Sequence, residues 1–482
     1  MISLPNVFWA IILIGLFLLI SNIIRARYQW MQALFLPSSI IAGFIVLLLG
    51  PQVLGLAVTN IAGADALFAG GVFPESVLTA WSGMPGLLIN IVFAALFMGK
   101  AIPGIREIWF RAGPQVVFGQ TVAWGQYVVG IGLCLLILTP LFGINPMAGA
   151  LIEIGFEGGH GTAAGMAETF RELGFEEGAD LALGLATIGI VSGVIIGTIL
   201  INWAARRKYI EVEDIESIKR TSIGRGELTR QKIKELDELE REKARERQST
   251  DPLSIHLGVV ALAIGIGWLI KEGLVGLEQA TWAGDGGPEL IRHVPLFPLA
   301  MIGGVIVQIF VDRAGLGHHL SRRLMNRISG VALDFTIVSA LGTLSIMALG
   351  ENLAPFLALA AAGIAWNVMA VIILAPRLIP YNWFERGVGD FGQSMGVTVT
   401  GLLLMRMADP PNKSGALESF GYKQLLFEPV VGGGLFTAAS LPLIYEFGPG
   451  FVLILTGCVT LAWLVFGYLT FGRMTMKRRP EP

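Results

Sequence analysis

Long apolar stretches with almost no charge run through this sequence, and they constrain the fold more than any other feature. A helix that crosses a bilayer needs about 20 mostly apolar residues. Apolar residues make up 54% of the 482-residue chain and charged residues 15%, against roughly 25% charged in soluble proteins. The sequence therefore predicts an all-α polytopic membrane protein. We interpret eleven stretches as membrane spans, namely residues 4–24, 33–50, 81–99, 114–140, 181–203, 253–270, 296–311, 328–350, 354–376, 426–446 and 450–471.

The charge balance and the cysteines exclude several classes of protein. The 34 Lys and Arg are matched by 36 Asp and Glu, so the basic excess typical of nucleic-acid-binding proteins is absent. Cys134 and Cys458 both lie in uncharged stretches, which excludes a disulfide framework and a cysteine-ligated zinc site. An intramembrane enzyme built on His160 and Glu157 is one alternative. Because no HExxH motif or second histidine at ligand spacing accompanies them, we expect no enzyme.

The basic residues predict the orientation, because segments on the cytoplasmic side carry an excess of Lys and Arg. If the N-terminus lies outside, 31 of the 34 basic residues fall in inside segments, Lys423 among them. The first span is not a cleaved signal peptide, because Arg25 and Arg27 follow its apolar run. We predict a multi-pass protein of the inner (plasma) membrane with its C-terminus in the cytoplasm. Three basic residues fall outside in this arrangement, Arg171, Lys271 and Arg292.

A charged segment divides the membrane-spanning part in two. Residues 206–250 carry 13 basic and 11 acidic side chains in 45 residues, with few apolar ones. This pattern is typical of a solvated helical linker in the cytoplasm, with a regulatory docking site as the alternative. We predict that the chain has four parts: an N-terminal membrane repeat at 1–205, the charged linker at 206–252, a C-terminal repeat at 253–446, and an additional helix with a cytoplasmic tail at 447–482.

The two membrane halves resemble each other weakly. The second span begins at Leu36 and Pro37 and continues IAGFIV over 41–46, and the seventh begins at Phe297 and Pro298 and continues IGGVIV over 302–307. The two halves begin on opposite sides of the membrane in the predicted topology. We therefore expect two inverted repeats of about five helices each, an arrangement common among transporters.

Two glycine-rich segments occupy matching positions in the halves. Residues 146–170 centre on EGGHGT at 157–162, and residues 387–405 contain Gly389, Asp390, Gln393 and Ser394. Irregular backbone at membrane depth is tolerated only where protein buries it or where it lines a wet cavity. Both segments are therefore predicted to be re-entrant hairpins. Free N–H groups at a helix start bind carboxylates, and unwound carbonyls with hydroxyl and carboxylate oxygens suit sodium.

GGHGT followed by small residues, and then ALGLATIGIVSGVIIG, resembles the sodium/glutamate symporter family of bacteria. The start of the second span and the glycine-rich segment after the ninth span share this resemblance. It implies a homodimeric secondary transporter with two inverted repeats, in which a mobile core carries substrate and sodium past a dimerising scaffold. By position, the re-entrant motifs of the family fall on 157–162 and 389–400 here. The sequence departs from the family pattern at Glu157, Leu404 and Arg406.

The glycine-rich segments supply the candidate site residues. His160 is a candidate ligand, proton carrier or packing residue, and Arg406 pairs either with a substrate carboxylate or with lipid at the inner interface. The predicted sodium ligands are Asp390, Gln393 and Glu157. The predicted substrate-binding residues are Gly158, Gly159, His160, Gly161, Thr162, Ser394, Thr398, Thr400 and Arg406.

Together with the resemblance, these residues predict a sodium-coupled symporter for glutamate or a related small carboxylate, and the resemblance implies elevator-type alternating access. The expected partners are sodium as coupling ion, a carboxylate or amino-acid substrate, the lipid bilayer and a second copy of the chain. No other cofactor is expected. A different organic anion and coupling to protons stay open as alternatives. An ion channel is the weaker alternative, because nothing in the sequence resembles a selectivity filter.

Overall fold

A computed structural model describes residues 4–28, 31, 36–99, 102–210, 252–284, 286–410 and 412–472. These residues form helices and connecting turns and contain no strand, so the all-α prediction is confirmed for them. The predicted charged linker lies almost entirely outside the described residues, and so does the tail after residue 472.

The helices before the linker are α1 (Leu4–Arg27), α3 (Ser38–Leu49), α4 (Leu56–Ala62), α5 (Glu75–Ala94), α6 (Ile105–Leu133), α7 (Thr139–Phe142), α8 (Leu151–Phe156), α9 (Gly159–Gly165), α10 (Ala167–Glu172) and α11 (Gly178–Arg206). Those after it are α13 (Pro252–Glu278), α14 (Phe297–Arg313), α15 (Arg322–Gly342), α16 (Ile346–Glu351), α17 (Leu353–Met369), α18 (Ala375–Leu378), α19 (Trp383–Ala408), α20 (Ala416–Phe427), α21 (Leu435–Phe447) and α22 (Pro449–Gly467). Short π-helical turns extend several of them, for example Pro51–Gly55 between α3 and α4.

Nine helices of the described chain, counted with these extensions, are long and apolar enough to cross a membrane. They coincide with nine of the eleven predicted spans. The other two predicted spans are shorter helices, α14 with 17 residues and α21 with 13. The predicted boundary at 426 was wrong, because α20 ends at Phe427 and a turn containing Pro429 and three consecutive glycines at 432–434 precedes α21.

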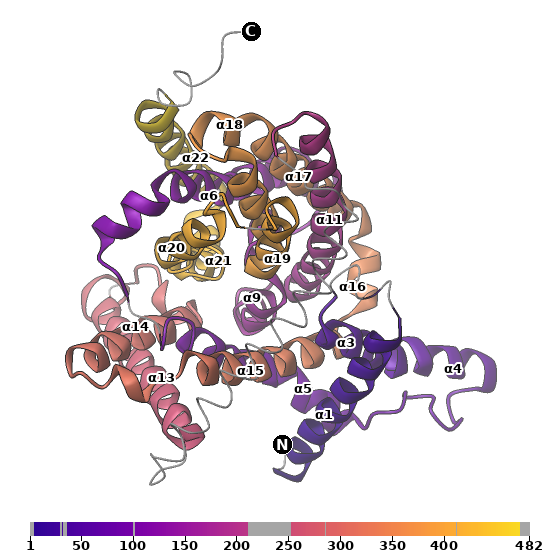
Figure 1. The fold of residues 1–482 in the computed structure, drawn as a ribbon. Coiled ribbons are helices and arrows are strands. Elements are labelled where there is room, and N and C mark those ends of the chain that lie inside the picture. The colour runs from indigo at the N-terminus through magenta and orange to yellow at the C-terminus, as the bar shows by residue number, and fades with distance from the viewer. Residues whose placement is uncertain are drawn as a thin grey trace.

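The helices pack into two bundles, and each bundle contains helices from before and from after the linker in the sequence (Figure 1). The first bundle contains α1, α3, α5, α13, α14 and α15. The second contains α6, α8, α9, α11, α17 and α19 to α22. In Figure 1, α5 and α15 of the first bundle run across below α9 and α19 of the second. The spatial division of the chain is therefore not the division that the linker makes in the sequence.

Within the first bundle, helices pack crosswise between the two halves of the sequence: α3 lies on α15, and α14 lies on α5. Both packing helices start at a proline, Pro37 as the residue before α3 and Pro298 as an early residue of α14. Proline suits the start of a helix because the N–H that it lacks would have no partner there.

Two glutamines complete this crosswise arrangement. Gln52, just after α3, donates to the carbonyl of Leu344 at 3.0 Å and accepts from the N–H of Ile346 at 2.7 Å. Gln308 of α14 accepts from the N–H of Gly99 at 2.7 Å. Each glutamine thus binds backbone groups that the end of a helix in the other half leaves without an intrahelical partner.

The bundles meet along α9, which packs against α5 and α15. A Cβ atom added to Gly161 would lie 3.0 Å from Cδ1 of Leu333 and 3.1 Å from Cδ1 of Ile89. A Cβ at Gly165 would lie 2.9 Å from Cγ2 of Ile89. This face of α9 is therefore smooth and fits closely against apolar side chains.

Candidate functional site

Two interruptions of helical structure lie in contact inside the second bundle. The first separates α8 from α9, where Gly159 adopts a φ of 67°. The second divides α19, where Val397 adopts a φ of 58° and a ψ of 177°. A Cβ atom on Gly159 would lie 2.4 Å from Cγ1 of Val397. The structure therefore brings together the two glycine-rich segments from which the sequence analysis took its site residues.

Glu157 and Ser394 connect the two interruptions. The Ser394 hydroxyl donates to Oε1 of Glu157 at 2.5 Å, and both residues are buried. The Ser394 carbonyl accepts hydrogen bonds from Gln126 at 2.8 Å and from Asn367 at 2.7 Å. Oε2 of Glu157 and Oε1 of Gln126 are buried without a hydrogen-bond partner in the described part of the chain. Two buried acceptor oxygens of this kind are costly unless a donor or a cation satisfies them.

Glu153, one helical turn before Glu157, has a different environment. Its carboxylate accepts from the Tyr127 hydroxyl at 2.6 Å, from the Thr437 hydroxyl at 2.8 Å and from the N–H of Gly432 at 2.7 Å. Both carboxylate oxygens are therefore partnered. Glu153 holds the glycine-rich turn before α21 against α8.

His160 and Thr162 lie on α9, just after the first interruption. Nε2 of His160 lies 2.9 Å from the hydroxyl oxygen of Thr187 on α11. The Thr187 hydroxyl itself donates to the carbonyl of Leu183, so His160 is the donor to Thr187. The Thr162 hydroxyl is buried, has no partner among the described residues and faces Gly433, where an added Cβ would lie 2.6 Å from it.

The two threonines after the second interruption have different partners. The Thr398 hydroxyl donates to Oε1 of Glu428 at 3.0 Å, and the Thr400 hydroxyl donates to the carbonyl of Gly396 at 2.6 Å. Glu428 is not among the site residues predicted from the sequence. The signal that could have found it is the segment EPVVGGG at 428–434, a third glycine-rich stretch that the analysis placed inside a span.

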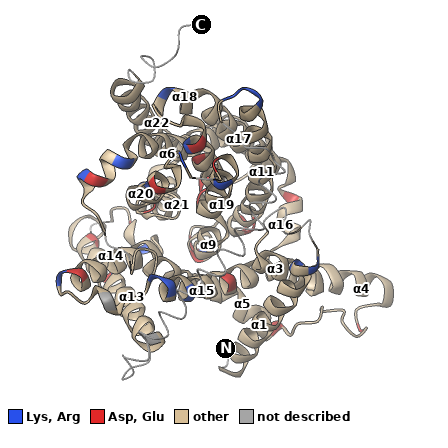
Figure 2. Cartoon of the chain, in the orientation of Figure 1, with Lys and Arg blue, Asp and Glu red and all other residues tan. Residues whose placement is uncertain are grey.

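Asp390 and Gln393, predicted as sodium ligands, are bound by a lysine. Nζ of Lys423 on α20 lies 2.7 Å from Oδ1 of Asp390 and 2.9 Å from Oε1 of Gln393. Asp390 and Lys423 are both 0% exposed. The sequence analysis counted Lys423 among charges of the cytoplasmic side, whereas the structure buries it completely. Figure 2 shows charged residues of α19 and α20 in the middle of the second bundle.

Arg406 lies on α19 beyond the second interruption, and its side chain is exposed. It differs in this from the other predicted substrate-binding residues of α19, since Ser394 and Thr400 are buried and Thr398 is half-buried. No group of three or more His, Cys, Asp or Glu that could hold a metal ion occurs in the described residues. A sodium ion bound by carbonyl, amide and hydroxyl oxygens needs no such group.

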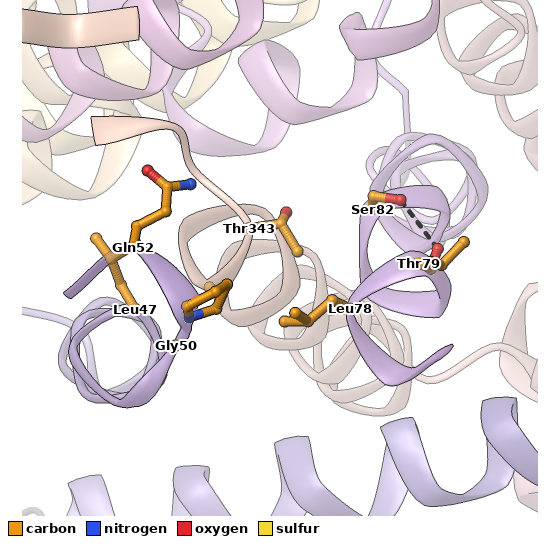
Figure 3. A pocket seen from close by; sticks show the side chains of 9 residues that line it. Leu47, Gly50, Gln52, Leu78, Thr79, Ser82 and Thr343 are labelled. Atoms are coloured by element: carbon orange, nitrogen blue, oxygen red, sulfur yellow. Dashed lines mark hydrogen bonds between the residues drawn. The ribbon is translucent and has the colours of Figure 1, made fainter. Parts of the chain in front are cut away.

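A pocket of 290 Å³ lies elsewhere, in the first bundle (Figure 3). It is lined from α3 and the turn after it by Leu47 and Gln52, from α5 by Thr79 and Ser82, and by Thr343 after α15. None of its lining residues belongs to the predicted site.

The sequence model of the sodium/glutamate symporter family matches residues 115–407. The chain belongs to this family. The match runs from α6 to α19, so it contains both interruptions and the contact between them, while α20 with Lys423 lies beyond it. The resemblance identified from GGHGT is thereby confirmed, and the family is one of transporters and not of enzymes. No curated protein sequence matches the chain.

Proposed function

We propose that this member of the sodium/glutamate symporter family is a sodium-coupled symporter for glutamate or a related small carboxylate. The observation that carries the proposal is the contact between the two interruptions, where buried oxygens of Glu157 and Gln126 have no hydrogen-bond partner among the residues that the structure describes. In transporters, interrupted helices near the midplane of the membrane bind substrate and coupling ions.

The substrate carboxylate binds at the interruptions in this proposal. N–H groups at a helix start favour an anion, and α9 begins at Gly159 while the second part of α19 begins after Val397. The hydroxyls of Ser394, Thr398 and Thr400 donate to Glu157, Glu428 and the Gly396 carbonyl, and in this proposal they exchange those bonds for bonds to the substrate. The buried Thr162 hydroxyl, without a partner in the described chain, is the strongest single candidate among the side chains. Arg406, exposed on α19, is proposed to attract the anion or to bind one of its carboxylates.

Sodium binds beside Glu157 in this proposal. Hard cations prefer oxygen ligands, and Oε2 of Glu157 and Oε1 of Gln126 are buried oxygens without partners among the described residues. The other predicted ligands, Asp390 and Gln393, hold the ammonium of Lys423 in the position where a cation would lie. Oδ2 of Asp390 also lacks a hydrogen-bond partner among the described residues, but Lys423 already compensates the charge of this carboxylate, so we assign the coupling ion to Glu157.

We also propose two inverted repeats, at 1–205 and 253–446, with re-entrant hairpins at 146–170 and 387–405 and an additional last helix. The crosswise packing of α3 on α15 and of α14 on α5 supports this, because a two-fold relation between the halves would generate both pairs. Gln52, just after α3, and Gln308, within α14, each also accept from a backbone N–H that follows the helix packed against them, α15 or α5.

Elevator-type transport in a homodimer is the proposed mechanism. The second bundle, which holds the interruptions, moves relative to the first. The smooth face of α9 against Ile89 and Leu333 supports such movement. The first bundle forms the dimer scaffold in this proposal, and its helices α1 and α13 have largely exposed apolar faces, as does α22 of the second bundle. We place the protein in the inner (plasma) membrane, with the N-terminus outside and the linker and C-terminus in the cytoplasm.

Uptake by proteoliposomes tests the function. We expect saturable uptake of labelled glutamate or of a related dicarboxylate when sodium is outside, and little uptake when choline replaces sodium. Uptake driven by a pH gradient without sodium would indicate proton coupling instead. Flux that rises linearly with substrate concentration would indicate a channel.

A further inference from the structure

A buried lysine occupies a site that has the ligands of a small cation. Nζ of Lys423 contacts Oδ1 of Asp390 and Oε1 of Gln393, and Nε2 of Gln424 donates to the same amide oxygen at 2.8 Å. Lys423 and Asp390 are fully buried. A carboxylate and an amide oxygen that converge on one positive charge form the kind of oxygen site that also binds sodium.

The surroundings are shaped for the ammonium group. A Cβ atom on Gly119 of α6 would lie 2.5 Å from Cε and 2.7 Å from Nζ of Lys423, so glycine at this position leaves room for the end of the lysine side chain where it lies, and a larger residue would make it shift. Nζ also lies 3.8 Å from the centroid of the Phe427 ring, within the range of a cation–π interaction. Residues of α6, α19 and α20 therefore hold the lysine in place together.

A buried carboxylate needs a compensating charge, since an isolated one is strongly disfavoured in a low-dielectric interior. Two cations could compensate Asp390: a sodium ion taken from solution, or a charge carried by the protein itself. The distances show that the second is present. Because α20 packs on α19, the helix that carries this charge lies against the helix that carries Asp390.

We infer that Lys423 is a built-in cation that replaces a sodium ion at the site formed by Asp390 and Gln393. This inference rests on the proposed sodium-coupled function and deepens it. The site binds no sodium in the natural protein, and sodium coupling depends on oxygens elsewhere, at Glu157. Removal of the lysine side chain converts the site into one that binds a monovalent cation.

Thermal unfolding of the purified full-length protein in detergent tests this inference, with NaCl exchanged for choline chloride at constant ionic strength. Four variants are compared with the wild type. Lys423→Ala removes the charge and leaves space for an ion. Asp390→Asn combined with Lys423→Met neutralises the pair and fills the space. Lys423→Met alone removes the charge without leaving space. Lys208→Ala changes an exposed lysine and serves as the control.

We expect Lys423→Ala to gain a sodium-specific rise in Tm of about 2–4 °C beyond that of the wild type, because a newly bound ion stabilises the folded state. Lys423→Met should show no such gain, and Lys208→Ala should match the wild type. The double variant Asp390→Asn with Lys423→Met should keep the full sodium-dependent rise in Tm of the wild type.

Two results would overturn the inference: a folded Lys423→Ala protein without additional sodium response, or a neutral pair that loses part of the wild-type response. If Lys423→Ala does not fold, the double variant Asp390→Asn with Lys423→Met tests the inference by itself. Failure of the proposed function is a separate result, since it appears as wild-type uptake that does not depend on sodium.

Discussion

The two interruptions in the second bundle differ in the size of the residue at the break. The first is built from glycine, and Gly159 has the positive φ that glycine adopts easily. The second places a β-branched residue, Val397, at a φ of 58° and a ψ of 177°, a conformation that costs about 1–3 kcal/mol. Cγ1 of Val397 lies where a side chain of Gly159 would be. One interruption is therefore small so that the other can be large, and exchanging the sizes tests whether their contact matters.

The largest effect is expected for Gly159→Leu. The new side chain would collide with Val397, so the two interruptions would separate. We expect glutamate uptake to fall by about a hundredfold or more, the scale of loss that misplacing groups by an ångström produces in enzymes. Uptake by proteoliposomes measures this, and size-exclusion chromatography shows whether the protein is folded.

Gly174→Leu is the matched control, because Gly174 has a φ of 72° but an added Cβ there would meet no atom of the described residues within 4 Å. It reproduces the backbone strain without the collision. Equal losses in both variants would mean that strain alone, and not the contact with Val397, explains the effect.

Glu157→Gln is expected to act next most strongly. Glutamine still accepts the hydrogen bond from Ser394 but removes the negative charge proposed to bind sodium. The sodium concentration for half-maximal uptake should rise about tenfold, which corresponds to about 1.4 kcal/mol. The sodium dependence of initial uptake rates measures it.

Glu153→Gln, one turn away, provides the comparison. Since Tyr127, Thr437 and Gly432 already satisfy Glu153, this variant should lower Tm and leave the sodium dependence unchanged. An unaltered sodium dependence in Glu157→Gln would remove Glu157 from the proposed site.

Arg406→Gln tests whether the second interruption has a charged partner for the substrate. If Arg406 binds a substrate carboxylate, the apparent affinity for glutamate should fall about tenfold, while Arg406→Lys keeps part of it. Competition uptake assays give both values. Near-normal affinity in both variants would leave the backbone N–H groups as the main carboxylate partners.

The smallest effect is expected for Val397→Gly. Glycine relieves the backbone strain but leaves the space beside Gly159 empty, so the second interruption is held less firmly. We expect apparent substrate affinity to fall about threefold, measured from the concentration dependence of uptake. Val399→Gly changes an exposed valine two residues on and should affect affinity less. If Val399→Gly has the larger effect, the contact between the interruptions contributes nothing specific.

The sequence predicted the helices and the glycine-rich segments well, because apolar length and local glycine content are properties of short stretches. It did not predict the role of Lys423. The distribution of basic residues indicates on which side of a membrane a segment lies, but burial of one lysine depends on Asp390, 33 residues away. Glu428 was missed because the turn after it was taken as part of a span. Gln126 and Asn367 converge on Ser394 only after folding.

The glutamine bonds in the first bundle bear on how the chain is made. The N–H of Gly99 binds Gln308, and the carbonyls of Ala95 and Met98 accept from Arg322, residues synthesised more than 200 positions later. The Gln52 side chain forms its hydrogen bonds with Leu344 and Ile346, which are also synthesised much later. Until the second half is inserted, these backbone groups of the first half have none of these partners. The first half, inserted alone, therefore lacks these hydrogen bonds until α14 and α15 are inserted beside it. The two halves expressed as separate chains should accumulate only when both are present.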